Sequence, residues 1–385
     1  MNLNTNILKN LFFTGSTSIG DLSNMVGKSV PITTKGIKDL LKKGYILNLG
    51  LTDSTGGRKA YIYKADQNKL GNIIAISIER THTLIDVFNI DKVKINNTIQ
   101  INIPLFQEAD LYKKILLEVS KIKDSNSNSS FLGIGIIIPG FVEKENKINA
   151  SHPIDSPIYN IAKNLEEDSG IITYIENDST AIALVEKHFG KAKNSSHTLV
   201  INLTWGVGLG ILINNSIFRG YKGYAGEFSH IPLGDSNKLC ACGKKGCLEV
   251  EASLQTAISY IEKRIEEGEA SILNNKDLPI TYERLAHAYN IGDQLAIEAI
   301  KRIGHMLGKG IATLIHILNP EKIILAGKGT VFGEIILSEV QSSIHLYCIP
   351  RLSDQTKLEL SELKDVLTLA AACTVIEQIT KINLH

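Results

Sequence analysis

The apolar residues of the first 65 positions recur at helical spacing in three stretches. Such stripes predict short amphipathic helices, and they cover residues 7–12, 19–26 and 30–44. Ser18 precedes the second stretch and can cap it, and Pro31 suits the first turn of the third. A strand at 45–51, a turn at 53–57 and a returning strand at 58–63 complete the pattern. The segment is therefore predicted to be three helices followed by a two-stranded wing.

From Asn72 onward, apolar runs of strand length alternate with helical stretches. The predicted strands cover residues 73–78, 84–88, 131–138, 171–176, 199–203 and 322–325, and the helices 111–122, 180–189, 253–266 and 293–318. Residues 205–210 are predicted to form a glycine-rich loop and residues 124–130 a solvated connection. Strands and helices that alternate in two halves predict an α/β fold with two lobes. The polar segment 66–71 is read as a linker between domains 1–65 and 72–385.

Charge is distributed unevenly along a chain whose net charge is only +1. Residues 1–65 contain nine Lys or Arg and three Asp, a net charge of +6, whereas the remainder carries −5. A basic head on a mildly acidic body predicts that only the head binds a polyanion. The polar start of the chain lacks a secretory signal, and no apolar run is long enough to cross a bilayer. We therefore expect a cytoplasmic protein without membrane contact.

Helix, turn, helix and wing together form an arrangement that reads DNA. The predicted DNA contacts lie at the start and on the exposed face of the third helix and at the wing tip: Ser29, Thr33, Thr34, Lys35, Lys38, Arg58 and Lys59. The alternative is a small helical domain whose lysines form a solvated face. The helix order, the wing and its Gly-Gly-Arg tip together favour DNA. Gly36 lies inside the predicted recognition helix, where glycine costs about 1 kcal/mol relative to alanine.

A histidine and three cysteines lie close together in the segment 230–249. His230, Cys240, Cys242 and Cys247 can complete a tetrahedral Zn²⁺ shell, which would hold a structural metal because no position is left for water. A disulfide with a spare thiol, or three unrelated cysteines, are the alternatives. A reducing cytoplasm disfavours the disulfide.

Several motifs resemble those of the ROK family, which groups bacterial sugar kinases and sugar-responsive repressors. They are Ile138-Pro139-Gly140, Glu176-Asn177-Asp178, Gly226-Glu227-Phe228-Ser229-His230, the cysteine loop ending Cys247-Leu248-Glu249, and the wing motif Gly56-Gly57-Arg58. The resemblance covers nearly the whole chain, and the cysteine and histidine spacing matches the family's zinc signature. It implies an N-terminal winged helix-turn-helix followed by a two-lobed domain of actin-like, ribonuclease-H-like fold.

The resemblance also implies a site for a sugar or sugar phosphate effector. Its residues would be Gly140, Asn177, Asp178, Glu227, His230 and Glu249. Carboxylates and an amide supply the acceptors and donors that match vicinal hydroxyls. His230 would bind zinc through one ring nitrogen and leave the other for the sugar. A simpler role for Asp178, capping the helix that follows, is compatible with sugar binding.

Phosphoryl transfer distinguishes the kinases of the family from its repressors. In the kinases the residue matching Asp178 is the general base, and two glycine-rich turns hold the nucleotide phosphates. Here the first turn reads Glu79-Arg-Thr-His-Thr83 without glycine, and Trp205 stands in the second. The sequence therefore predicts a sugar-responsive repressor that binds operator DNA as a homodimer, with a tetramer as the alternative. An active sugar kinase with an appended head, and a repressor regulated by a protein partner, are the rival hypotheses.

Overall fold

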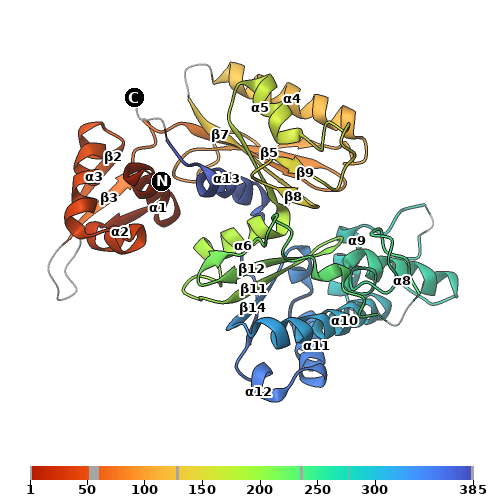
Figure 1. The fold of residues 1–385 in the computed structure, drawn as a ribbon. Helices are drawn as coiled ribbons and strands as arrows, with labels where there is room; N and C mark the ends of the chain where they lie inside the picture. Colours follow the sequence, from red (N-terminus) through yellow and green to blue (C-terminus); the bar gives the residue numbers. More distant parts are fainter. Residues whose placement is uncertain (1, 52–59, 127–129, 235–236, 276, 383–385) are drawn as a thin grey trace. The chain divides into compact units, whose positions relative to one another are not determined.

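The computed structural model describes residues 2–51, 60–126, 130–234, 237–275 and 277–382 (Figure 1). The chain folds into two compact units, Met1–His188 with Asp365–His385, and Phe189–Lys364. The first unit holds the basic head and one α/β lobe, and the second unit holds the other lobe. The chain crosses between the units twice, immediately after His188 and immediately before Asp365.

The head has the helices that the apolar stripes predict. They are α1 (Leu3–Thr14), α2 (Ile19–Val26) and α3 (Val30–Lys42), and a sheet in the order β1-β3-β2 adds β1 (Ser16–Ser18), β2 (Ile46–Leu51) and β3 (Tyr61–Ala65). The Ser18 hydroxyl accepts a hydrogen bond from the amide of Asp21 at 3.2 Å, which confirms the predicted cap of α2. The wing strands pair antiparallel. The tip predicted between them, including Arg58 and Lys59, lies outside the described residues.

The lobe of the first unit is a five-stranded sheet in the order β10-β7-β4-β5-β6. The strands are β4 (Asn72–Ile78), β5 (Thr83–Phe88), β6 (Ile99–Ile101), β7 (Phe131–Ile138) and β10 (Thr173–Asn177). A two-stranded ribbon, β8 (Val142–Glu143) and β9 (Ile148–Asn149), follows β7. Pairing is parallel among β10, β7 and β4 and antiparallel from β4 to β6. Because both faces of this sheet are covered, its central strands are apolar on both sides, as the sequence runs predict.

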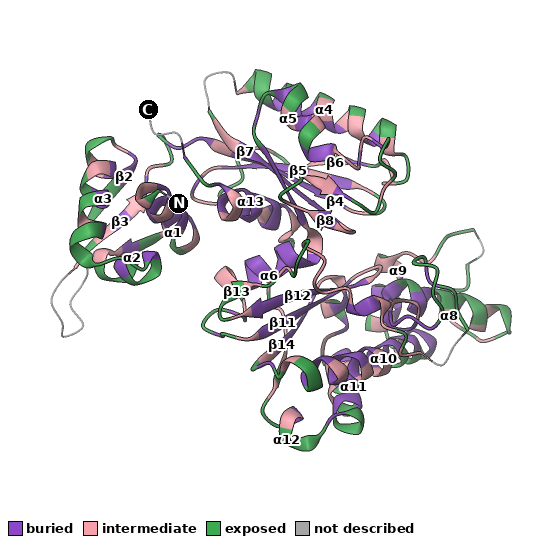
Figure 2. Cartoon of the chain, viewed as in Figure 1, coloured by how far each residue is buried: buried purple, intermediate pink, exposed green. Residues whose placement is uncertain are grey.

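Helices cover both faces of this sheet (Figures 1 and 2). On one face, α4 (Glu108–Ser125) and α5 (Ile161–Ser169) close a core that is rich in isoleucine. On the other face, α13 (Leu367–Gln378) packs against β7 and β4. Helix α6 (Asp178–Phe189) follows β10 and ends where the chain enters the second unit. The C-terminal segment thus returns to complete the first lobe.

The second unit has a sheet in the order β13-β12-β11-β14-β15. Its strands are β11 (Thr198–Leu203), β12 (Val207–Ile213), β13 (Ser216–Ile217), β14 (Lys322–Ala326) and β15 (Lys357–Leu360). Its helices are η1 (Phe228–His230), α7 (Glu249–Ala252), α8 (Leu254–Glu266), α9 (Tyr282–Asn290), α10 (Gln294–Leu318), η2 (Lys328–Phe332), α11 (Gly333–Tyr347) and α12 (Pro350–Ser353). Helix α10 packs against α11, α8 and α7. None of the helices in the described parts of the chain is long and apolar enough to cross a membrane.

The two sheets share one topology. In each, the first strand pairs antiparallel with the second and parallel with the fourth, and the fifth lies beyond the fourth. The third strand completes the antiparallel edge. This repeated strand order confirms the predicted two-lobed α/β architecture of actin-like type.

Most of one predicted loop is a strand. Residues 205–210 are expected from the sequence to form a glycine-rich loop, but Val207 begins β12, which pairs antiparallel with β11. Gly208 lies opposite Asn202 and Gly210 opposite Val200. Backbone pairing with β11 therefore determines the structure here, although glycine is a poor strand former. The segment 66–71, predicted to be a linker, forms a compact turn. Leu70 is buried there, and its amide donates a hydrogen bond to the carbonyl of Asp66.

Candidate functional site

Three of the predicted sugar residues meet at one edge of the first lobe. Strands β7 and β10 are parallel neighbours, with Ile138 opposite Asn177, so both strands end at this edge. The Asn177 amide nitrogen donates to the carbonyl oxygen of Gly140 at 3.1 Å. Its oxygen accepts from the backbone amides of Ser179 and Thr180, at 3.0 and 3.1 Å, and so caps α6. Asn177 thereby joins the Pro-Gly turn to the start of α6, and its side-chain amide has a second N–H to donate.

Gly140 is required by its surroundings. Its φ is +112°, and a Cβ atom there would lie 2.4 Å from Ser151 Oγ and 2.9 Å from Asn149 Oδ1. Asn149 is fully buried and donates to the carbonyl of Pro139 at 3.0 Å, while Ser151 Oγ accepts from the Phe141 amide at 2.8 Å. Asn149 and Ser151 therefore shape the turn that carries Gly140. Sequence reasoning missed both, because only the fold places them against that turn.

Asp178 is the first residue of α6. Burial raises the pKa of its carboxyl group, and the nearby Glu79 carboxylate adds to the rise. Hydrogen bonds from the Ser179 amide and hydroxyl, at 2.7 and 3.1 Å, and the positive charge of Arg80 act in the opposite direction. Because its pKa is raised, this carboxylate is more basic than a solvated one and hence a stronger hydrogen-bond acceptor.

The other three predicted sugar residues gather in the second unit. His230 ends the short helix η1, Glu227 precedes that helix, and Glu249 begins α7. His230 Nε2 lies 3.8 Å from a carboxylate oxygen of Glu227 and 3.9 Å from one of Glu249. One ring nitrogen of the histidine is thus directed at two carboxylates.

The second ring nitrogen of His230 is directed at the cysteine cluster. Its Nδ1 lies 3.6 Å from Cys240 Sγ, and the Sγ atoms of Cys242 and Cys247 are 3.5 Å apart. The donor atoms of all four residues lie within 4.8 Å of one another. The loop is closed by the Gly243 amide, which donates to the Cys240 carbonyl at 2.9 Å, and by the Cys240 amide, which donates to the Lys244 carbonyl at 2.8 Å.

This donor set fits a tetrahedral metal ion. Zinc–sulfur bonds of about 2.3 Å at tetrahedral angles separate two sulfur atoms by about 3.8 Å, which is close to the spacing found here. The cysteines of the chain all lie in its described part, and each is a free thiol. The cluster of His230, Cys240, Cys242 and Cys247 can therefore hold a metal such as zinc, with all four coordination positions supplied by protein.

The predicted DNA-contacting residues differ in accessibility. Lys35 and Lys38 are exposed on α3, Thr34 is half-buried, and Ser29 is exposed at the N-cap position of that helix. The expectation for Thr33 is wrong, because Thr33 is fully buried and its hydroxyl donates to the Ser29 carbonyl at 3.2 Å. A one-residue step along a helix turns the side chain by about 100°, which places Thr33 on the core face.

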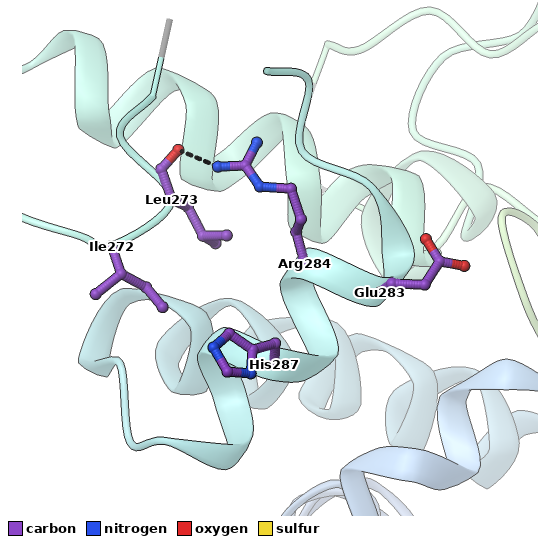
Figure 3. Close-up of a pocket in the computed structure, with 5 residues that line it drawn as sticks. All are labelled: Ile272, Leu273, Glu283, Arg284 and His287. Carbon is purple, nitrogen blue, oxygen red and sulfur yellow. Dashed lines mark hydrogen bonds between the residues drawn. The ribbon is translucent and has the colours of Figure 1, made fainter. Parts of the chain in front are cut away.

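A hollow of about 270 Å³ lies elsewhere in the second unit (Figure 3). It is lined by Ile272, Leu273, Glu283, Arg284 and His287. The Arg284 guanidinium donates to the Leu273 carbonyl at 3.3 Å and to the carbonyls of residues 278 and 279 at 2.6 and 2.7 Å. These bonds fix a loop, so we assign this arginine a structural role rather than ligand recognition.

Comparison with known proteins identifies the family. The ROK family model matches residues 73–378. A putative xylose repressor of Caldicellulosiruptor sp. (strain Rt8B.4) is 30% identical over 371 residues, which cover 93% of this chain and 91% of the relative. The DNA-binding transcriptional dual regulator NagC of Escherichia coli (strain K12) is 28% identical and covers 90% of this chain and 84% of its own.

Solved structures share the fold. A ROK family transcriptional regulator, described as a homolog of the E. coli MLC protein, superposes with a TM-score of 0.81 at 24% identity, over 97% of this chain and 95% of its own. A ROK family glucokinase from Streptomyces griseus, crystallised with glucose and AMPPNP, gives a TM-score of 0.69 at 24% identity over 80% of this chain and 100% of its own. The chain therefore belongs to the ROK family, in its branch of transcriptional repressors of sugar metabolism genes.

Proposed function

We propose that this repressor binds operator DNA through its head and that a sugar effector controls this binding. The observation that carries the proposal is His230, with one ring nitrogen directed at three thiols and the other at two carboxylates. The His230 ring can keep one orientation towards a ligand only if the cysteine loop that it contacts is itself fixed. The arrangement thus suits a ligand site supported by a structural metal.

Two sets of residues, one within each unit, are the candidates for sugar contacts. Gly140, Asn177 and Asp178 belong to the first unit, and Glu227, His230 and Glu249 to the second. Three carboxylates accept hydrogen bonds from hydroxyl groups, and the second N–H of the Asn177 amide donates one. A sugar that lacks a matched hydroxyl would leave a partly buried carboxylate unpaired, which gives selectivity. Relatives are named for xylose and for N-acetylglucosamine, so both sugars belong in the first panel.

Zn²⁺ would be held by His230, Cys240, Cys242 and Cys247. When bound, it supplies a rigid, closed coordination centre rather than a reactive one. The fixed cysteine loop would then hold Glu249, two residues after Cys247, and the His230 ring in position. Loss of the metal would loosen both.

The head would bind DNA with α3 in the major groove. Lys35 and Lys38 are exposed on this helix, and Ser29 is exposed at its start, where backbone amides can meet a phosphate. Residues 58 and 59 would add wing contacts. Heads of this type read two half-sites, so we propose a homodimer on a palindromic operator, with a tetramer as the alternative.

Kinase activity is disfavoured by the residues at the two phosphate turns. In the first, the Glu79 amide bonds the His82 carbonyl at 2.9 Å, and their side chains pair at 3.0 Å. A carboxylate at such a turn repels phosphate, and side chains keep backbone amides away from it. Trp205 places bulk at the second turn. We therefore propose that the chain does not phosphorylate its sugar.

The test combines operator binding with nucleotide turnover. A duplex selected from a random library by the full-length, zinc-loaded protein is titrated in the presence of D-xylose, N-acetylglucosamine and their phosphates. We expect one sugar to weaken binding at least about tenfold, since effector couplings are commonly of this size. No response to any sugar would refute the effector assignment and favour a protein partner. ADP release with ATP and the bound sugar would establish the kinase alternative.

A further inference from the structure

Helix α6 connects the proposed effector residues to the DNA-binding head. Its first turn is capped by Asn177 and contains Asp178. In its last turn the His188 ring stacks on the Phe13 ring of α1, with centroids 3.6 Å apart and planes inclined by 8°. A rise of 1.5 Å per residue separates Asp178 from His188 by about 15 Å. A single helix therefore spans the distance from the ligand residues to the head.

This helix is well suited to move as a unit. Residues 179–186 are all buried, so the side chains along α6 are enclosed by the surrounding protein. Close-packed interiors resist local bending, and a displacement at one end of such a helix is transmitted to the other. The chain enters the second unit directly after His188, so this end of α6 is also a covalent connection between the two units.

Within the head, helix α1 connects Phe13 to the recognition helix α3 through close packing. Phe13 lies near the end of α1, and the start of α1 packs on α3 so closely that a Cβ atom on Gly36 would lie 2.7 Å from Ile7 Cδ1. Lys92 fixes the end of α1, because its Nζ donates to the Phe12 carbonyl at 2.5 Å and lies 5.0 Å from the Phe12 ring centroid. A shift of Phe13 thus displaces the helix against which α3 is seated.

Other contacts hold the head to the lobe without touching α6. Lys9, which is buried, donates from Nζ to the carbonyl of Glu377 in α13 at 2.8 Å. Lys64 of the wing pairs with Asp91 at 2.7 Å. These contacts dock the head, and removal of one of them provides a control that leaves α6 intact.

Burial, together with the smaller effect of the Lys187 charge, lowers the pKa of His188 to about 3. The ring is therefore neutral at physiological pH. A neutral imidazole on a phenyl ring is a packing contact, whose strength depends on ring overlap rather than on ionisation. A planar aromatic substitute can preserve such a contact, whereas alanine or leucine cannot.

We propose that α6 couples effector binding to the DNA-binding head and that the Phe13–His188 stack is its contact with the head. The proposal rests on the proposed function, which places sugar at one end and operator at the other. A sugar held by Asn177 and Asp178 favours one position of α6, and the stack passes this bias to α1 and then to α3. His188 and Phe13 are positioning residues, since neither touches sugar or DNA. Coupling between two ligands is reciprocal, so operator binding must also change the first turn of α6.

The first experiment needs no sugar. Amide hydrogen exchange of residues 179–182 is measured in the full-length protein with and without the selected duplex. We expect the duplex to change this exchange at least about threefold in the wild type and in Lys64→Gln, and to leave it unchanged in His188→Ala and Phe13→Leu. An equal response in wild type and His188→Ala would overturn the proposal, as would a loss of the response in Lys64→Gln.

The second experiment measures the ratio of operator affinities without and with D-xylose or N-acetylglucosamine, whichever binds the wild type in calorimetry. His188→Ala should keep its sugar affinity within about twofold but reduce a ratio of about tenfold to below about twofold. His188→Phe should retain most of the ratio because its ring can still stack. A full ratio in His188→Ala would refute the role of α6. A wild type that binds the duplex but responds to neither sugar would refute the effector assignment instead, while the exchange experiment still decides about α6.

Discussion

Replacing Gly36 by alanine provides a quantitative test of how the recognition helix is seated. In an isolated helix, alanine is better than glycine by about 1 kcal/mol. In the head, however, the new Cβ would lie 2.7 Å from Ile7 Cδ1 and 3.1 Å from Leu3 Cδ2. Comfortable carbon–carbon contacts begin near 3.5 Å, so Ile7 must retreat by about 0.8 Å. Overpacking of this kind costs about 1–3 kcal/mol, and we expect a net loss of up to about 2 kcal/mol.

Ile7→Val tests the cause, because it removes the Cδ1 atom that meets the new methyl group. Alone, it should cost about 0.5–1.5 kcal/mol. When Gly36→Ala is combined with Ile7→Val, it should no longer destabilise and should recover part of the helix-propensity gain. The double-mutant cycle should therefore give a favourable coupling of about 1–2 kcal/mol.

The assay is native-state hydrogen exchange of the amides of α1 and α3 in the full-length protein, which reports the opening free energy of the head separately from that of the lobes. Additive effects of the two substitutions would contradict the close contact between α1 and α3. A Gly36→Ala protein stabilised by the full helix propensity of about 1 kcal/mol would refute the reasoning outright.

Three further predictions address metal, charge and DNA. Cys242→Ala should lose the metal, as measured by elemental analysis, and melt at a lower temperature with weaker sugar binding, whereas Cys348→Ala, outside the cluster, should keep its metal. Because burial raises the pKa of Asp178, ionisation of this carboxyl lowers the stability of the folded state as the pH rises from about 3.9 through the raised value. Asp178→Asn should therefore melt higher than wild type at pH 7, with the difference vanishing in melting curves recorded below the unfolded pKa, while it loses sugar affinity. Lys35→Gln should weaken operator binding for all sequences and lower the salt slope by about 1, and the charge-matched substitution of the exposed Lys357, the first residue of β15, by Gln should not.

Local patterns explain why so much of the fold could be predicted. The apolar stripe of α2 together with its cap, Ser18, predicts both the helix and its first residue, because the cap hydrogen bond involves only residues three apart. The cysteine cluster could likewise be predicted from the sequence, since its three thiols lie within eight residues. Two-lobed topology followed from the alternation of strands and helices and from the family resemblance.

Features that depend on contacts across the fold could not be predicted. Asn149 and Ser151 lie against Gly140 only because β8 and β9 fold back onto the turn after β7. Gly208 is a strand residue because β11 offers a partner, and no local signal outweighs its preference for turns. Thr33 was misplaced because a stripe defines the buried face of a helix only to within one residue at its edge.

Asp178 shares the capping of α6 with its neighbour Asn177, since the Ser179 amide donates to both side chains. Asn177 accepts hydrogen bonds from the amides of Ser179 and Thr180 and thus satisfies the donors that a cap must bind. Asp178 is the acidic residue of this first turn, and desolvation makes its ionised form unfavourable and offsets what it gains from the helix dipole. A residue that served only the fold could be neutral at this position without loss. A carboxylate at this position suits the proposed sugar, whose hydroxyl groups would add to the two hydrogen bonds that Ser179 donates to it.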